Sequence, residues 1–322
     1  MLKLILYGIA ASFLFSTTFV FNSWLSGHGG DWFWTAFLRY LYVFIIATSI
    51  LFFSLRKIGG LNSLFSNLTR NALFWLLSGS IGSGVFYLLL CYASQFAAGW
   101  IVATTWQSTL LMTPVALFSL GVRVRPSHIA LLAAATAGIL LVDWPLIVAN
   151  YSISGRALGA IILAGYCYPV GNLLVGYATN GGHRRIPMIR HWTMNSTLCR
   201  IWLMTAGALP LLCLVGLVRH PAPPSLEQLG TVLYIALSTG VAGTALFLTA
   251  LHKAKDTTEI AAVTATQSLE IPFALAFEVL FFKASYPNLI QMTGVILVVV
   301  SVSAFLFLGR TAKPDTDGAH VE

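Results

Sequence analysis

Residues 259–282, EIAAVTATQSLEIPFALAFEVLFF, form an apolar run that is long enough to cross a bilayer and yet contains carboxylates. A helix of this length spans about 36 Å, slightly more than the hydrocarbon core of a membrane. A charged Glu270 near its centre costs about 2.5–3.5 kcal/mol, so its presence there indicates a function. Pro272 removes a backbone donor and frees the carbonyl of Ser268, which favours a kink beside the carboxylate. The sequence therefore predicts an interrupted helix that lines a cavity.

The composition of the chain is that of a membrane protein with many spans. Hydrophobic residues make up 57% of the 322 positions and charged residues only 9%, whereas about a quarter of the residues in soluble domains are charged. The net charge of +8 comes from basic residues scattered through short loops, which argues against a nucleic-acid-binding face. The four cysteines lie in apolar runs, and no metal-ligand spacing or phosphate-binding loop is present. We therefore expect buried cysteines, no disulfide, no metal and no cofactor.

Apolar runs predict an all-α integral membrane protein with ten transmembrane helices. The first run shows no small-residue cleavage site, so it is expected to be an uncleaved span. The polar tail, residues 311–322, is expected to be disordered. The predicted spans are residues 3–25, 33–55, 72–93, 98–120, 128–147, 157–178, 195–218, 229–251, 260–282 and 289–308.

The distribution of Lys and Arg outside the spans predicts the orientation of the chain. Thirteen basic residues fall on the side of the two termini and three fall on the opposite side. By the positive-inside rule, both termini are expected in the cytoplasm. The thirteen are Lys3, Arg56, Lys57, Arg70, Arg123, Arg125, Arg184, Arg185, Arg190, Lys253, Lys255, Arg310 and Lys313; the three are Arg156, Arg219 and Lys283.

The two halves of the chain show a weak internal repeat. TTWQS at 104–108 aligns with TATQS at 264–268, and a proline, Pro114 or Pro272, follows each QS pair. Because each half holds five spans, the second half enters the membrane from the opposite side, which makes the repeat inverted. Such repeats place a binding site near the midplane, between paired helix interruptions. The predicted five-helix repeats are residues 1–150 and 151–310.

Four stretches carry a family resemblance: FLFSTTFVFN at 13–22, GGDWFWTAFLRYLY at 29–42, GTALFLTAL at 243–251 and AAVTATQSLEIPFALAFEVLFF at 261–282. With ten spans in two inverted halves, the chain resembles the drug/metabolite transporter superfamily, and in it the EamA-like branch named "putative multidrug-resistance efflux transporters". The resemblance implies a secondary exporter of the bacterial inner membrane. Its central cavity would be formed chiefly by spans one, three, four, six, eight and nine. The substrate stays open, since the superfamily moves drugs, amino acids, nucleotide-linked sugars and other metabolites.

Three charged residues inside the spans are candidates for coupling or gating. Glu270 is expected either to bind a proton and the substrate in turn, or to be a structural carboxyl hydrogen-bonded to a neighbouring helix. Glu278 lies about 12 Å further along the same helix, too far to share one proton with Glu270. By rise per residue, Glu278 and Arg39 lie at similar depths below the outer boundary. We therefore expect a buried ion pair between them, with a gating role as the alternative.

Polar and aromatic residues on the cavity-forming spans are candidates for substrate contact. Aromatic faces with one carboxylate suit an organic cation, although hydroxyls in membrane helices often bond only their own backbone or a neighbouring helix. The glycines of the third span, Gly79, Gly82 and Gly84, are expected to permit close helix packing, with a hinge as the alternative. The candidates are Ser16, Thr17, Thr18, Asn22, Trp106, Gln107, Tyr166, Tyr168, Asn172, Thr266 and Gln267, together with Glu270.

These features predict a secondary active exporter of a drug-like cation or metabolite, which works by alternating access. Proton antiport through Glu270 is the expected coupling, and an uncoupled exporter of amino acids or similar metabolites is the alternative. A membrane-embedded enzyme or a non-transporting subunit is less favoured, because the loops are short and carry no nucleophile–base pair. The expected partners are a small-molecule substrate, protons and the lipid bilayer, and one chain is expected to act as a monomer.

Overall fold

The computed structural model describes residues 1–55, 60–121 and 129–311, and within these ranges the chain is helical with no β-strand. Nine of the described helical stretches are long and apolar enough to cross a membrane, and the last helix begins with a shorter apolar segment, Leu289–Phe305. The predicted all-α membrane fold is confirmed, and the ten-span inverted repeat is consistent with it. The predicted disordered tail lies outside the described residues from 312 onward, as do Arg56, Lys57, Arg123, Arg125 and Lys313.

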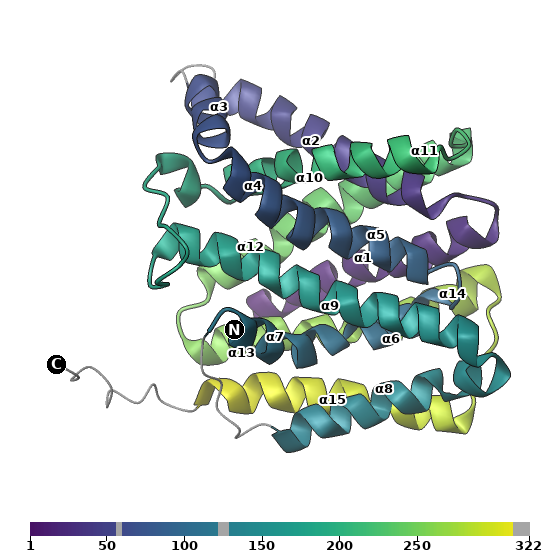
Figure 1. Cartoon of the computed structure of the whole chain (residues 1–322). Coiled ribbons are helices and arrows are strands. Elements are labelled where there is room, and N and C mark those ends of the chain that lie inside the picture. The colour runs from purple at the N-terminus through teal and green to yellow at the C-terminus, as the bar shows by residue number, and fades with distance from the viewer. Residues whose placement is uncertain (56–59, 122–128, 312–322) are drawn as a thin grey trace.

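The helices lie close to the predicted spans, and Figure 1 shows their arrangement, coloured along the chain. The first half comprises α1 (Leu2–Gly27), α2 (Trp32–Leu55), α3 (Gly60–Arg70), α4 (Ala72–Gly79), η2 (Ser80–Val85), α5 (Phe86–Ala93), α6 (Gly99–Trp106), α7 (Ser108–Ser119) and α8 (Ile129–Ala149). The second comprises α9 (Tyr151–Asn180), η4 (Trp192–Asn195), α10 (Thr197–Arg219), α11 (Leu226–Ile235), η5 (Ala236–Gly243), α12 (Thr244–Lys253), α13 (Thr257–Ala265), η6 (Thr266–Leu269), α14 (Glu270–Phe282) and α15 (Leu289–Thr311).

Short polar side chains cap the beginnings of several helices. The side chain of Asn150 accepts a hydrogen bond from the N–H of Ile153 at 3.2 Å, and α9 accordingly begins at residue 151 rather than at the predicted 157. Ser225 caps α11 in the same way, accepting the N–H of Gln228 at 3.1 Å. Each cap satisfies one of the N–H groups that the first turn of a helix leaves without a backbone partner.

Irregular turns occur in corresponding spans of the two halves. The π-helical segment η2 joins α4 to α5 in the third span, and η5 joins α11 to α12 in the eighth. The fourth span is interrupted at Gln107, between α6 and α7, and the ninth at η6, between α13 and α14. Paired irregularities of this kind are what an inverted repeat predicts.

The interruptions lie at the QS pairs and not at the prolines that follow them. Gln107 donates its N–H to the carbonyl of Thr104 at 3.1 Å and accepts the N–H of Leu110 at 3.0 Å, so the backbone tightens to a three-residue spacing there. Pro114 lies inside α7, and Pro272 lies in the first turn of α14. A proline is tolerated in a first turn because its missing N–H has no intrahelical partner to lose.

The eleven-residue helix α3 lies where a loop was expected. Its Asn67 is buried, donates to the hydroxyl of Thr193 at 2.7 Å and accepts the indole N–H of Trp75 at 3.3 Å. Leu64 is buried on the same helix. A prediction from apolar runs misses this segment, because eleven residues with several polar side chains are too few to span a membrane.

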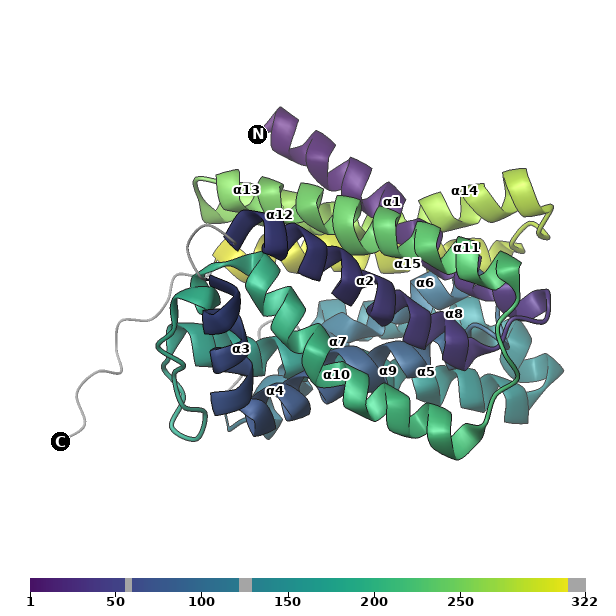
Figure 2. The same ribbon diagram turned by 90° about the horizontal axis from the view of Figure 1, so that it is seen from above.

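The helix α1 lies at the contact between the two halves. It packs along α14, α12 and η5 of the second half. Ser12 donates its hydroxyl to the carbonyl of Thr266 at 2.7 Å, and the hydroxyls of Thr18 and Thr239 lie 2.7 Å apart. Seen from above in Figure 2, α1, α12 and α13 lie on one face of the bundle, and α4, α9 and α10 lie on the other. These buried polar contacts therefore join α1 to elements of the second half.

Glycines allow helix backbones to touch at several places, three of which join α4 to α10, η2 to α9 and α8 to α15. A Cβ atom on Gly79 of α4 would lie 2.8 Å from the carbonyl carbon of Gly207 in α10. A Cβ atom on Gly82 of η2 would lie 2.6 Å from the Cα of Gly171 in α9. The predicted role of the third-span glycines in close packing is thereby confirmed at Gly79 and Gly82.

The third place is the contact between α8 and α15, which lie side by side at the lower edge of Figure 1. A Cβ atom on Gly294 would lie 2.6 Å from the carbonyl oxygen of Gly138. The fifth and tenth predicted spans are thus held together as a pair at one edge of the bundle.

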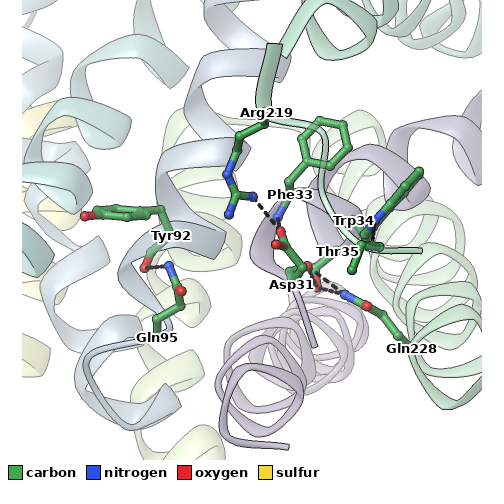
Figure 3. Close-up of polar contacts among 9 residues, drawn as sticks. Asp31, Phe33, Trp34, Thr35, Tyr92, Gln95, Arg219 and Gln228 are labelled. Atoms are coloured by element: carbon green, nitrogen blue, oxygen red, sulfur yellow. Dashed lines mark hydrogen bonds and ion pairs between the residues drawn. The ribbon is translucent and has the colours of Figure 1, made fainter. Parts of the chain in front are cut away.

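The loop before α2 ties the end of α10 to the beginning of α11 (Figure 3). The carboxylate of Asp31 lies 2.7 Å from the guanidinium of Arg219 and accepts the N–H of Phe33 at 2.8 Å. Gln228 donates to the carbonyl of Asp31 at 2.7 Å and to the hydroxyl of Thr35 at 2.9 Å. Because one loop holds both partners, these three helix ends are fixed relative to one another.

One expectation about the cysteines is wrong. Cys91, Cys167 and Cys199 are buried free thiols, but Cys213 of α10 is exposed. Leu214, like other apolar residues in the last turns of α10, is also exposed. An apolar exposed face suits contact with lipid, so an apolar sequence around a cysteine does not by itself place that cysteine in the protein core.

Candidate functional site

A cavity of about 410 Å³ lies within the helix bundle and is lined by elements of both predicted repeats. The contributing elements are α1, α2, η2, α5, α6 and α7 of the first half and α9, α10, η5, α12, α13, η6, α14 and α15 of the second. The volume falls in the usual range of small-molecule sites. Most of the lining side chains are aromatic, aliphatic or hydroxyl-bearing, and two are charged, Arg39 and Glu270.

Glu270 lines this cavity at the point where the ninth span is interrupted. It is the first residue of α14, directly after the 3₁₀ turn of η6, and only 5% of its surface is exposed. Within the described ranges, its carboxylate forms no hydrogen bond and no ion pair with another side chain or with the backbone. The hydrogen bond to a neighbouring helix that a structural role requires is therefore not present among the described residues.

The glutamines of the two QS pairs, Gln107 and Gln267, both line the cavity. Gln107 lies between α6 and α7, and Gln267 lies in η6, so each amide is carried by an interrupted span. An interrupted helix is typical of spans that line a cavity or a substrate pathway. The two interruptions therefore face one space, to which each of them contributes a glutamine side chain.

Three aromatic rings from three helices form a cluster on the cavity wall. The ring centroids of Phe86 and Trp106 are 5.1 Å apart, and Tyr168 lies 5.0 Å from Phe86 and 5.5 Å from Trp106. Trp106 and Tyr168 were among the predicted substrate contacts, and Phe86 was not. Asn172 also lines the cavity and donates to the backbone carbonyl of Tyr168 at 3.1 Å. Aromatic pairs at these separations contribute to packing and present π faces to a ligand.

The other predicted polar residues do not line this cavity, except Thr18, which lines it and bonds to Thr239. Their side chains are engaged elsewhere, mostly with the backbone of their own helix, as membrane hydroxyls often are. Ser16 donates to the carbonyl of Phe13, Thr17 to that of Leu14 and Thr266 to that of Val263; Asn22 bonds to the hydroxyl of Tyr87, and Tyr166 bonds to the hydroxyl of Ser119.

The predicted ion pair between Arg39 and Glu278 is wrong. Glu278 instead caps the start of α6: its two carboxylate oxygens accept the N–H groups of Gly99 at 2.7 Å and Trp100 at 3.1 Å. Arg39 lies over the ring of Tyr87, with its Cζ atom 4.0 Å from the ring centroid. In the described part of the chain no ion pair joins the two. Equal depth in the membrane does not determine the direction in which each side chain points from its helix. The first N–H groups of α6 have no partner within their own helix, and they are the closer partners of the Glu278 carboxylate.

Replacing Glu278 by glutamine is expected to lower the free energy of unfolding by about 1–3 kcal/mol. The amide retains one acceptor oxygen and turns an NH₂ group toward a buried backbone donor, which leaves that donor unsatisfied. Thermal unfolding of the detergent-purified protein measures the change. Glu227→Gln, at an exposed position in the first turn of α11, is the matched control. Equal melting temperatures for the two variants would contradict the capping role.

Several cavity residues were not predicted. Tyr40 lies on α2, Thr239 on η5, and Thr244 and Phe247 on α12. The family resemblance named the eighth span as part of the cavity but no residue on it. The sequence feature that could have pointed to these residues is the stretch of small residues STGVAG at 238–243. It lies in the π-helical segment η5, which contains Thr239 and directly precedes Thr244.

Asp143 is another buried carboxylate, besides Glu270 and Glu278, and it was not predicted from the sequence. It lies on α8, is 4% exposed and accepts the hydroxyl of Thr105 at 2.9 Å. It does not line the cavity. The clusters of three or more His, Cys, Asp or Glu side chains that would suit a metal ion do not occur among the described residues.

Comparisons with known proteins agree with this architecture. A family model, EmrE, described as "Putative multidrug resistance efflux transporter", matches residues 2–311. The chain is 27% identical over 332 aligned positions to the Bacillus subtilis (strain 168) protein YjlA, with 97% of each chain covered. It is 29% identical over 265 positions to a 42.1 kDa protein of Shouchella clausii, covering 79% of this chain and 66% of that one. A crystal structure shares the fold with a TM-score of 0.57 and 17% identity, over 95% of this chain and 98% of that one.

Proposed function

Because the chain belongs to the EmrE family of multidrug resistance efflux transporters, we propose that it is a secondary active exporter of a small organic solute. It works by alternating access, in which the halves 1–150 and 151–310 rearrange around one central site. The observation that carries this proposal is the cavity lined from both halves, with the carboxylate of Glu270, which has no partner among the described residues, at a helix interruption. Intramembrane carboxylates facing a cavity mark ion and substrate pathways.

Proton antiport through Glu270 is the coupling that we propose. The carboxylate holds a proton in one orientation and the solute in the other, so that the two never occupy it together. Among the described residues, the Glu270 carboxylate forms no hydrogen bond or ion pair. This supports a role in proton exchange, because no interaction with another protein group has to be broken when the carboxylate loses its proton. Trp106, Gln107, Tyr168, Asn172 and Gln267 form the proposed contacts to the body of the solute.

The proposed setting is the inner membrane of a bacterium, with both termini in the cytoplasm and one chain as the working unit. The excess of Lys and Arg on the side of the termini supports the orientation. A complete cavity within a single chain supports the monomer. Green fluorescent protein fused to the C-terminus is expected to fluoresce, because it folds in the cytoplasm. It does not fluoresce when it is exported unfolded, so a non-fluorescent fusion would contradict this orientation.

Flux into proteoliposomes tests the exporter and its coupling together. With an acidic lumen and an alkaline outside, protons that leave through the protein are expected to drive uptake of ethidium or radiolabelled L-phenylalanine above equilibrium. Nigericin, which collapses the pH gradient, is expected to return uptake to the equilibrium value. Solute flux that runs only down the solute's own concentration gradient and is the same with and without a pH gradient would favour the uncoupled exporter. In that case Glu270 contributes only to the shape of the site. The absence of flux for every solute, with labelled lipid converted to product, would revive the enzyme alternative.

A further inference from the structure

We propose that the cavity selects a zwitterion of amino-acid size, whose ammonium group meets Glu270, whose carboxylate meets Arg39 and whose apolar or aromatic body lies against the ring cluster. This proposal rests on the exporter function and names its substrate class. It departs from the organic cation that a lone carboxylate would favour, because the structure places a cation in the same cavity.

The two charged side chains of the cavity are opposite in sign and come from different halves. Arg39 lies on α2 and Glu270 on α14. Among the described residues, neither forms an ion pair, either with the other or with a third group. Their charged atoms are thus more than a salt-bridge distance apart, so a ligand that contacts both must carry its two charges far enough apart to span that separation. An unpaired charge within a membrane protein is costly, and a ligand with both charges neutralises the two at once.

The position of Arg39 suits a bound carboxylate. Its guanidinium lies over the ring of Tyr87, 4.0 Å from the centroid. The ring is held by Asn22, whose amide donates to the Tyr87 hydroxyl at 3.2 Å. The Arg39 guanidinium also interacts with the Tyr87 hydroxyl, and its remaining N–H groups can donate to a carboxylate, for which a guanidinium can form two parallel hydrogen bonds. Tyr87 is therefore a positioning residue for Arg39.

The opposite pole of the cavity suits an ammonium group. Glu270 supplies the negative charge, and Tyr168 and Trp106 supply aromatic faces that attract a cation. Phe86 completes the apolar wall against which a side chain of the solute can pack. A volume of about 410 Å³ accommodates a solute of amino-acid size with room to spare.

Solutes with one charge fit this arrangement less well. A cation pairs with Glu270 but shares the cavity with an uncompensated Arg39. An anion pairs with Arg39 but faces Glu270. Each such mismatch leaves one buried charge unsatisfied and adds repulsion from the like charge. Selectivity therefore comes from exclusion as much as from attraction.

A series of three probes tests the proposal on the purified full-length protein. L-Phenylalanine carries both charges, L-phenylalaninamide only the ammonium group, and N-acetyl-L-phenylalanine only the carboxylate. The rise in melting temperature with probe concentration gives an apparent Kd for each. We expect phenylalanine to bind at least about tenfold more tightly than either singly charged probe, which is the effect of one lost charge-assisted hydrogen bond.

Charge-removing variants then assign each group to its partner. Arg39→Gln is expected to remove the preference for phenylalanine over its amide, and Glu270→Gln the preference for phenylalanine over its N-acetyl derivative. The controls are Arg200→Gln and Asp143→Asn, which remove a charge within a span but outside the cavity. These controls are expected to keep both preferences.

The proposal is overturned if the amide binds wild-type protein as tightly as phenylalanine does, or if no probe binds. Because this comparison needs only the wild-type protein, it stands even if Arg39→Gln fails to fold. Flux in proteoliposomes separates this failure from that of the exporter function. Movement of ethidium without phenylalanine rejects the zwitterion alone, whereas the absence of movement for both rejects the exporter.

Discussion

Glu270→Gln is expected to abolish solute accumulation driven by a pH gradient. Glutamine has nearly the shape of glutamate but carries no negative charge and releases no proton, so neither the proton nor an ammonium group can be held at this position. A charge-assisted hydrogen bond contributes about 1.5–3 kcal/mol, so the affinity for a solute with an ammonium group falls roughly 10- to 100-fold as well. Downhill flux at high solute concentration is expected to persist, because the cavity itself remains.

The measurement is the accumulation ratio in proteoliposomes with and without an imposed pH gradient. Asp143→Asn is the matched control: it neutralises another buried acid, which is bonded to Thr105 and lies outside the cavity. We expect the control to accumulate solute like the wild type. Undiminished gradient-driven accumulation in Glu270→Gln would remove the coupling role and leave Glu270 as a part of the scaffold.

Gly207→Ala is expected to cause the largest loss of stability among glycine-to-alanine substitutions at the described positions. A Cβ atom on Gly207 would overlap the carbonyl oxygen of Trp75 and lie 2.5 Å from its carbonyl carbon. These are backbone atoms, so α10 and α4 must move apart, and Gly79 then loses its contact with the same segment of α10. Overpacking of this kind costs about 1–3 kcal/mol, and the upper end is expected where backbones collide.

Thermal unfolding of the purified variants checks this expectation. Gly176→Ala in α9 is the matched control, because no atom lies within 4 Å of the Cβ that it adds. Alanine has the higher helix propensity by about 1 kcal/mol, so the control is expected to be neutral or slightly stabilising. If the Gly207→Ala protein had the same melting temperature as the control, α4 and α10 would be able to move apart without a loss of stability.

The spans could be predicted closely because a bilayer imposes their length. About twenty apolar residues are needed to cross it, and each predicted run corresponds to a helical segment in the structure. The bilayer imposes no such requirement on α3, which lies outside the spans and was missed. The start of α9 was placed late, since the cap at Asn150 is a local hydrogen bond and not a matter of hydropathy.

The site could be predicted only in part, because sequence gives the depth of a residue but not the side on which it faces. Glu270 and Gln267 line the cavity, whereas Ser16 and Thr17, on the equally polar α1, do not. The rotation of each helix depends on contacts with other helices, such as the contact of Ser12 with Thr266. The expected ion pair of Glu278 failed for the same reason, since matched depths do not bring two side chains together.

The hydrogen bonds of the π-helical segments η2 and η5 join residues five apart instead of four, so each segment accommodates a surplus residue within its span. When the position of the surplus residue shifts along the helix by one residue, the residue that it passes rotates by about 100° around the helix axis. The backbone of the helix stays hydrogen-bonded. Phe86 and Thr244 directly follow η2 and η5, and both line the cavity. A shift of either segment by one residue would therefore change which side chains line the cavity, while the helix keeps its backbone hydrogen bonds.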